Sequence, residues 1–502
     1  MFGIILAIGY TALFIFLIRK IKFFQTEHIS QNLISLVFIL KIIAGTALWF
    51  VYTRHYSERL TADIFKYFDD GKVIYNALFS KPIDYFKMLF GIPDASLNHY
   101  YRDDMRHWSR EFNQGMYNEN RTLIRFNALI DVFSFGHYHV HTVFMCFLST
   151  MGLMGIFKTF SSFLSGKTKE LFVVTFLLPS VIFWSSGVLK EGLILFALGM
   201  CLYHYYKLLN EKIAIPRIAW LGMFLFLLSI TKLYILLIIL PVLTAHAWIS
   251  KTNYSYPEIK YLAALAIYFS IGLLMPKYNF PFMLMEKQRQ AVYMAQGGSY
   301  LANHDTKRFV YIDPKNEKRI IPIKGKPGFC KIVPGVPYVS WNMETFLDSA
   351  YIEHASDTNA YWIFYNQAAA GSNIKIPSLN GTFLSILKNT PVAFSNTFLR
   401  PYIFETKNPL MLLSAIENCL ILVITFVCVL FCYKNVPNRH LVYFCLTTVI
   451  LLFALIGLTT PVMGASVRYK IPVLPFLLIA FLLILDKEKL LKKFPFLKKI
   501  IA

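Results

Sequence analysis

The stretch HLVYFCLTTVILLFALIGL, residues 440–458, is apolar over a length that matches the roughly 30 Å hydrocarbon layer of a bilayer. Backbone amides in hydrocarbon must form their hydrogen bonds within the segment, so such a run is expected to be a helix. Runs of this kind recur and predict an all-α integral membrane protein with about eleven transmembrane helices. The predicted spans are 2–18, 33–52, 138–157, 171–188, 191–207, 217–231, 233–249, 260–276, 409–432, 440–458 and 471–485.

Composition and charge agree with this fold class. The chain has 502 residues, of which 56% are hydrophobic and only 16% are charged, whereas a soluble protein has about a quarter charged residues. The net charge of +22 could indicate nucleic acid, but the excess Lys and Arg gathers in every second loop, which is typical of cytoplasmic loops. We therefore expect membrane lipids and no nucleic acid as partners, an external N-terminus and a cytoplasmic C-terminus.

The remaining segments divide the chain further. The stretches 64–68 and 85–90 are amphipathic and predict helices along the membrane surface. Residues 309–312 and 319–323 predict a hairpin, with helices expected near 342–354 and 358–370. The predicted organisation is 1–52 (first two transmembrane helices), 53–137 (first external loop with amphipathic helices), 138–276 (transmembrane helices 3–8), 277–408 (large external α/β domain), 409–485 (transmembrane helices 9–11) and 486–502 (basic cytoplasmic tail).

Three carboxylates, Asp63, Asp69 and Asp70, follow the second predicted span within eight residues. On a helix, Asp63 and Asp70 share one face and Lys66 lies between them, so Lys66 is expected to pair with one of them. A carboxylate at a membrane boundary can accept the proton of a hydroxyl group or hold a divalent cation such as Mg²⁺ or Mn²⁺. The alternative is that these are ordinary surface acids, with Asp63 as a helix N-cap.

Several charged residues lie at the predicted external boundary, against the positive-inside trend. They are Lys190 with Glu191, Lys232, and Arg468 with Lys470. A lipid-linked phosphate lies at head-group depth and needs cations there, and arginine binds it through two parallel hydrogen bonds. The alternative is that these cations are anchors at helix ends.

Other charged residues lie in or near the predicted spans. Lys41 and Glu417 fall within apolar runs and should face the bundle interior, either as an ion pair or in a substrate role. Arg400 and Glu405 precede the ninth span and are candidates for one pocket. His354 in the large domain is a candidate acid or base.

Three places in the chain carry a resemblance to a known family. They are the acids Asp63, Asp69 and Asp70, the segment Pro179–Gly187 followed by Lys190-Glu191, and the opening of the last helix, Arg468-Tyr469-Lys470-Ile471-Pro472-Val473-Leu474-Pro475. The last is similar to an Arg-Tyr-x-x-Pro-x-x-Pro pattern. Together they resemble the GT-C-type membrane glycosyltransferases, which take sugars from polyprenyl-phosphate donors at the external membrane face. In this chain the acidic loop follows the second helix instead of the first.

The resemblance implies a bacterial inner-membrane enzyme that transfers a sugar, with inversion, to a glycan, lipid or protein acceptor. Asp63, Asp69 or Asp70 would activate the acceptor hydroxyl or hold a metal ion. The residues around the donor would be Lys190, Glu191, Arg400, Arg468, Tyr469 and Lys470, and the domain at 277–408 would select the acceptor.

Two other functions are consistent with the layout. An O-antigen-type polymerase or ligase would depend on Arg400, Arg468 and His354 instead of the acids. A flippase of a lipid-linked sugar would need a continuous polar path through the bundle, for which Lys41 and Glu417 are the candidates.

Overall fold

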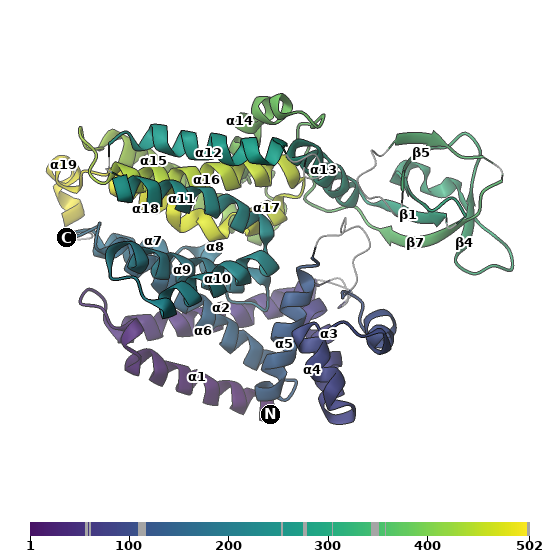
Figure 1. Cartoon of the computed structure of the whole chain (residues 1–502), viewed down its shortest axis with the longest axis horizontal. Helices are drawn as coiled ribbons and strands as arrows, with labels where there is room; N and C mark the ends of the chain where they lie inside the picture. The colour runs from purple at the N-terminus through teal and green to yellow at the C-terminus, as the bar shows by residue number, and fades with distance from the viewer. Residues whose placement is uncertain are drawn as a thin grey trace.

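The chain folds into a bundle of helices with a β-sheet domain beside one end of it (Figure 1). This computed structural model describes residues 1–55, 59, 62–108, 117–252, 255–274, 279–303, 305–342, 351–356 and 358–498. The helices are α1 Phe2–Lys20, α2 Gln31–His55, α3 Asp63–Ser80, α4 Pro82–Phe90, α5 Asn120–Ser134, α6 Tyr138–Ser161, α7 Thr168–Phe176, α8 Pro179–Trp184, α9 Lys190–Asn210, α10 Ile215–Thr231, α11 Leu233–Thr252, α12 Pro257–Leu274, α13 Phe280–Gln296, α14 Phe383–Leu399, α15 Pro409–Leu430, α16 Arg439–Thr459, α17 Met463–Tyr469, α18 Leu474–Ile484 and α19 Lys487–Lys493.

Within the described residues, eight helices are long and apolar enough to cross a membrane. They are Phe2–Lys20, Gln31–Arg54, Tyr138–Ser161, Lys190–Asn210, Leu233–Thr252, Pro409–Leu430, Arg439–Thr459 and Met463–Ile484. These helices make the chain a helical membrane protein and coincide with eight of the predicted spans. The total of about eleven stays a prediction, which depends on residues 171–188, 217–231 and 260–276.

The expected single helix at 171–188 is wrong. It is two short helices, α7 and α8, separated at Leu177 and Leu178. Pro179 explains the break, because proline lacks the backbone N–H that a continuous helix requires and disfavours a helical conformation in the residue before it.

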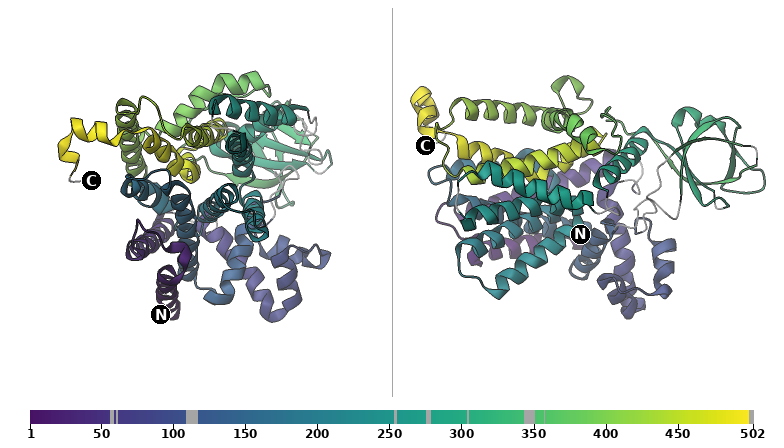
Figure 2. Two further views of the ribbon diagram at one scale, coloured as in Figure 1. Left: turned by 60° about the vertical axis from the view of Figure 1, so that its left-hand side comes forward. Right: turned by 45° about the horizontal axis from the view of Figure 1, so that its top comes forward.

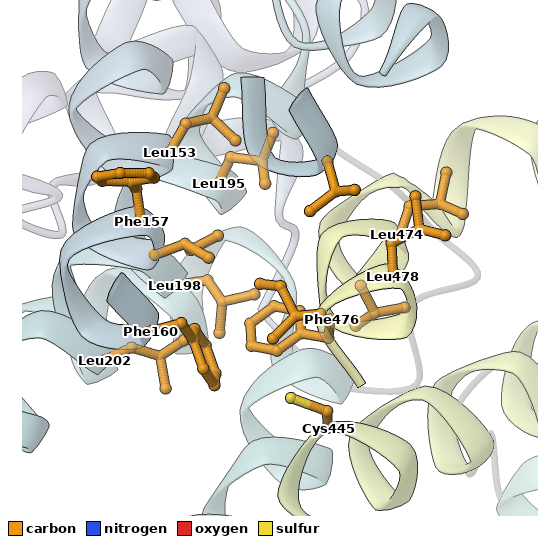
Figure 3. Packing of buried hydrophobic residues seen from close by; sticks show 14 of the residues in the cluster. Leu153, Phe157, Phe160, Leu195, Leu198, Leu202, Cys445, Leu474, Phe476 and Leu478 are labelled. Carbon is orange, nitrogen blue, oxygen red and sulfur yellow. The ribbon is translucent and has the colours of Figure 1, made fainter. Parts of the chain in front are cut away.

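The core of the bundle lies where α6, α9, α16 and α18 meet (Figure 3). Gly152 of α6 and Gly199 of α9 allow these two helices to touch through their backbones, because a Cβ atom on Gly199 would lie 1.8 Å from the carbonyl oxygen of Gly152. Small residues let helices approach closely where lipid provides no hydrophobic driving force. Large side chains of α6, α9 and α18 fill this core, including Leu153, Phe157, Phe160, Leu195, Leu198, Leu202, Leu474, Phe476 and Leu478.

The two ends of the bundle carry different parts of the chain. At one end, Lys487 of α19 binds Glu170 at 2.7 Å, and Arg439 faces Glu258 at 3.5 Å, so several of the predicted basic loops meet there. At the other end lie the sheet domain and the helices α3 to α5 (Figures 1 and 2). The helices predicted at 64–68 and 85–90 are confirmed as parts of α3 and α4, and their position along the membrane surface stays a prediction.

The sheet has seven antiparallel strands in the order β3-β4-β7-β1-β2-β5-β6. The predicted hairpin is wrong, because β2 pairs with β1 and β5 whereas β3 pairs with β4. The helix expected near 358–370 is wrong as well, since β7 runs there. Of the helix expected near 342–354, residues 343–350 lie outside the described part, and the rest contains a strand. The strands are β1 Gly298–Asn303, β2 Arg308–Ile312, β3 Ile320–Pro322, β4 Phe329–Ile332, β5 Pro337–Asn342, β6 Tyr351–His354 and β7 Tyr361–Gln367.

The sheet domain is attached to the bundle through its first helix and its return segment. The side chain of Gln288 in α13 donates to the carbonyl oxygen of Leu458 at the end of α16 and accepts from the amide of Leu379. The return segment 372–374 forms backbone hydrogen bonds with residues 461–463, which lead into α17. Residues 277–408 also contain α14, which packs along α16 as part of the bundle.

Candidate functional site

Arg468 lies at the centre of an ion-pair network between the bundle and α3. Its Nε donates to Glu191 Oε1 and its Nη1 donates to Asp63 Oδ2, both at 2.8 Å. The second oxygen of Asp63 lies 3.3 Å from Lys66 Nζ, so the predicted pairing of Lys66 is confirmed. Residues 405 positions apart in the sequence are therefore in direct contact.

Local structure explains why these side chains converge. Helix α17 ends at Tyr469, one residue after Arg468, and a 3-10 turn that contains Pro472 separates it from α18. Helix α9 begins at Lys190 after the unwound residues 185–189, which places Glu191 in its first turn. A negative charge is favoured there by the helix dipole. Asp63 is the first residue of α3.

A second part of the network surrounds Glu119, the residue that precedes α5. Its Oε1 accepts from Lys190 Nζ at 3.0 Å and also from Lys232 Nζ. Lys232 lies at the break between α10 and α11. Lys190 donates in addition to Asn120 Oδ1 at 2.8 Å. One carboxylate thus bridges two lysines that are almost completely buried.

Aromatic rings join the two parts. The ring centroid of Tyr469 lies 5.7 Å from Arg468 Cζ and 5.4 Å from Lys232 Nζ, so both cations contact one ring. Lys190 Nζ lies 5.3 Å from the ring centroid of Tyr67. Cations at this distance are attracted by the negative face of the ring. The network therefore contains three acids and four cations from five separate segments.

Electrostatics keep two acids of this network, Asp63 and Glu119, ionised. Burial by itself would raise the pKa of the Asp63 carboxyl, but the charges of Arg468 and Lys66 outweigh it and bring that pKa below its usual range. Burial likewise opposes ionisation of Glu119, and Lys232 and Lys190 bring its pKa below the usual range. Both groups are consequently poor proton acceptors while these contacts persist.

Asp69 and Asp70 do not join the network. Asp69 is bound by Arg59 through two hydrogen bonds of 2.9 and 2.7 Å. Asp70 turns into the protein, where its oxygens accept the backbone N–H groups of Arg106 and His107 at 3.2 and 2.8 Å. Burial raises the pKa of Asp70 to about 6.

A small pocket that opens to solvent lies beside these acids. Its volume is about 90 Å³, and it borders the network because Lys66 belongs to both. Burial, followed by the charge of Lys66, lowers the pKa of His107 in this pocket to about 4. The lining residues are Lys66, Asp69, Asp70, Asp104, Arg106 and His107.

Lys470 and Arg400, predicted to join Arg468, have other partners. Lys470, which follows the last residue of α17, donates through Nζ to Asn418 Oδ1 of α15 at 2.7 Å. Arg400 faces Glu405 at 3.4 Å. His354 lies on the edge strand β6 of the sheet.

Lys41 and Glu417 hold opposite ends of α8 instead of pairing with each other. Glu417 Oε1 accepts the backbone N–H of Ser180 in the first turn of α8, at 3.1 Å. Lys41 Nζ donates to the hydroxyl of Ser185, directly after the last turn. These contacts hold the short helix that leads to Lys190 and Glu191.

The three predicted acids do not fit a divalent cation in this arrangement. Both oxygens of Asp63 and Asp69 face cationic side chains, and both oxygens of Asp70 accept backbone N–H groups. In the described part of the chain, no three His, Cys, Asp or Glu side chains converge as ligands.

Sequence reasoning placed Asp63, Lys190, Glu191, Arg468 and Tyr469 near one another, and the structure does so too. It missed Glu119, which lies in a loop with no local pattern to distinguish it. Lys232 stands out in the sequence as a cation between two apolar helices, at the end where cations are rare, and the structure places it in the network. Neither a protein-family model, nor a curated protein, nor a solved structure matches the chain.

Proposed function

We propose that the chain is a membrane glycosyltransferase that moves a sugar from a polyprenyl-phosphate donor to a glycan, lipid or protein acceptor. One observation carries the proposal: Arg468 contacts Asp63 and Glu191 in a largely buried network that also holds Lys190 and Lys232. Ionisable groups buried at the ends of membrane helices are expensive and are generally retained for function. The proposed setting is the external face of a bacterial inner membrane, opposite the basic loops.

In this proposal the network is the site for the donor phosphate. Arg468 and the two lysines already have carboxylate partners, so an incoming phosphate exchanges one anion for another and leaves no cation unpaired. As the glycosidic bond breaks, negative charge develops on the phosphate oxygen. Preorganised cations stabilise that charge without rearranging during the reaction.

The contacts favour a transferase over the two alternatives. Arg400 is paired with Glu405, and His354 lies on the sheet edge, so the residues that a polymerase or ligase would use are not gathered around Arg468. The residues that a flippase would use are engaged in holding α8. Both alternatives stay open to the experiment below.

The test uses the purified full-length protein with farnesyl phosphate esters of labelled glucose, galactose, mannose and N-acetylglucosamine, and octyl glycosides as acceptors. We expect sugar transfer from at least one donor. Arg468→Ala should weaken farnesyl phosphate binding by at least about tenfold, since a charge-assisted hydrogen bond contributes roughly 1.5–3 kcal/mol.

Arg439→Ala is the matched control, because Arg439 begins α16 at the opposite end of the bundle and is exposed. Equal binding by the two variants, or transport of the donor between leaflets without any transfer, would refute the proposal.

A further inference from the structure

The segment that leads from β2 to β4 in the sheet domain carries a concentration of positive charge. Residues 315–326 contain five cations and a single acid, Glu317. The sheet domain lies at the end of the bundle opposite the basic loops, so the positive-inside trend that accounts for those loops does not account for this segment. All five cations are exposed, and they are Lys315, Lys318, Arg319, Lys324 and Lys326.

Neighbouring acids do not neutralise these cations. Glu317 Oε1 accepts from the hydroxyl of Ser299 at 3.1 Å, and Asp313 Oδ1 accepts the backbone N–H of Lys315 at 2.9 Å. In the part of the chain that the structure describes, no carboxylate forms an ion pair with any of the five cations. Their charge is therefore available to an anion from outside the protein.

Strand pairing brings apolar side chains beside the cations. Ile321 of β3 lies opposite Lys331 of β4, and Phe329 of β4 lies opposite Trp362 of β7. Side chains that are opposite each other, or two residues apart on one strand, point to the same face of a sheet, so these four share a face. Cys330 points to the other face and is buried in the core of the domain. The shared face is therefore the outer one, on which Ile321 and Trp362 are exposed.

Trp362 packs against the loop that carries Lys324 and Lys326. A Cβ atom at Gly328, where this loop ends, would collide with the indole ring, so glycine is required there. The ring of Phe329 meets the indole edge-on, with 5.1 Å between the ring centroids. Because the side chain of Trp362 is 38% exposed, it offers a flat apolar surface next to the lysines.

This combination fits a negatively charged polysaccharide. Exposed ammonium groups attract its carboxylates or phosphates, and the C–H face of a sugar ring packs on an aromatic ring. Strand β4 lies on the side of the sheet domain remote from the bundle (Figure 1), so the head groups of the membrane that the bundle spans are out of reach. Nucleic acid also combines charge with stacking, but the proposed external setting favours a glycan.

We propose that this basic face, formed by the five cations and Trp362, binds an acidic polysaccharide outside the membrane. Its identification with the acceptor glycan rests on the proposed function, whereas the binding itself does not. A single exposed ion pair contributes little, so affinity arises from several pairs formed at once along a chain of charged sugars.

The test measures binding of fluorescent oligogalacturonate to the purified full-length protein in uncharged detergent, by fluorescence anisotropy. Binding should weaken by at least about tenfold as NaCl rises from about 50 to about 200 mM. The double variant Lys324→Gln/Lys326→Gln should bind at least about fivefold more weakly than wild type. Lys489→Gln/Lys492→Gln is the matched control, because these lysines are exposed on α19 at the opposite end of the bundle, and it should bind within about twofold of wild type.

The variant Trp362→Leu separates recognition of sugar rings from attraction by charge alone. It should weaken oligogalacturonate binding by at least about threefold, because leucine has no flat face for a sugar ring. Its binding of poly-L-glutamate of equal charge should equal that of wild type, which also shows that the basic face remains folded.

The remaining outcomes contradict the proposal at different points. Failure of wild type to bind oligogalacturonate, or equal loss in the two lysine double variants, would overturn the basic face as the binding surface. Poly-L-glutamate or oligothymidylate bound as tightly as oligogalacturonate would overturn the preference for a glycan, and loss of both oligogalacturonate and poly-L-glutamate in Trp362→Leu would assign Trp362 a structural role. Absence of sugar transfer in the assay above would refute the proposed function alone, since the binding assay contains no donor.

Discussion

Replacing Glu119 with glutamine removes the negative charge between Lys190 and Lys232. Two ammonium groups are then left close together in side chains that are only 5% and 11% exposed. Removing one partner of a buried ion pair costs roughly 3–5 kcal/mol. Because Glu119 is itself 24% exposed, water screens part of the repulsion, and we expect the free energy of unfolding to fall by about 3 kcal/mol.

The assay is reversible unfolding of the purified protein in mixed micelles, followed by tryptophan fluorescence. The variants are Glu119→Gln, Lys232→Met and the double variant. Methionine at 232 lies between the rings of Tyr234 and Tyr469 and leaves a single lysine near position 119. The double variant should therefore be more stable than Glu119→Gln alone. A loss below about 1 kcal/mol in Glu119→Gln, or no recovery in the double variant, would refute the reasoning.

The same variant has a defined dependence on pH. The pKa of Glu119 in the folded protein lies below its ordinary value of 4.5. Its contribution to stability is therefore complete above pH 4.5 and is lost as the pH falls towards the folded-state pKa. Wild type should lose more stability than Glu119→Gln between pH 5 and pH 3, and parallel curves would contradict this.

Four further outcomes are expected. Lys41→Met should raise the free energy of unfolding by about 1 kcal/mol, because a fully buried ammonium with a hydroxyl partner is replaced by an apolar chain; a fall in melting temperature would contradict this. Asp69→Asn should change stability by less than about 1 kcal/mol, since its ion pair is exposed, and should retain transfer; lost transfer would place Asp69 in the site. The raised pKa of Asp70 means that its folded form binds protons more readily, so stability should fall as the pH rises from 4 to 6, and Asp70→Asn should remove that slope in unfolding curves. A cysteine at Lys493 should react with an impermeant maleimide only after permeabilisation, whereas one at Asp104 should react at once; labelling of both from one side would contradict the proposed orientation.

Much of the bundle could be predicted from the sequence because its elements depend on local composition. A run of about twenty apolar residues must become a helix in lipid wherever it occurs, and eight of the predicted spans are such helices. The prediction of one helix at 171–188 was wrong, because a single residue, Pro179, interrupts the helix within that apolar run. The prediction was also wrong in the sheet domain, because strand partners such as β3 and β4 are chosen by contacts that local patterns do not contain.

The residues of the candidate site could be predicted from the sequence only where an ionisable residue occurs at the boundary of an apolar run. Lys190, Glu191 and Arg468 stood out because ionisable groups are rare at apolar boundaries, and the structure brings all three together. Lys470, two residues from Arg468, also stood out, but the turn after α17 directs it towards Asn418.

The sequence by itself determined that this chain is a helical membrane protein with charges at one end of its helices, because the cost of burying polar groups in lipid acts on each residue separately. Only the tertiary structure decided which charges meet. The bridge of Glu119 between two lysines and the contact of Asp63 with Arg468 depend on helix packing, and packing is set by side chains distant in the sequence.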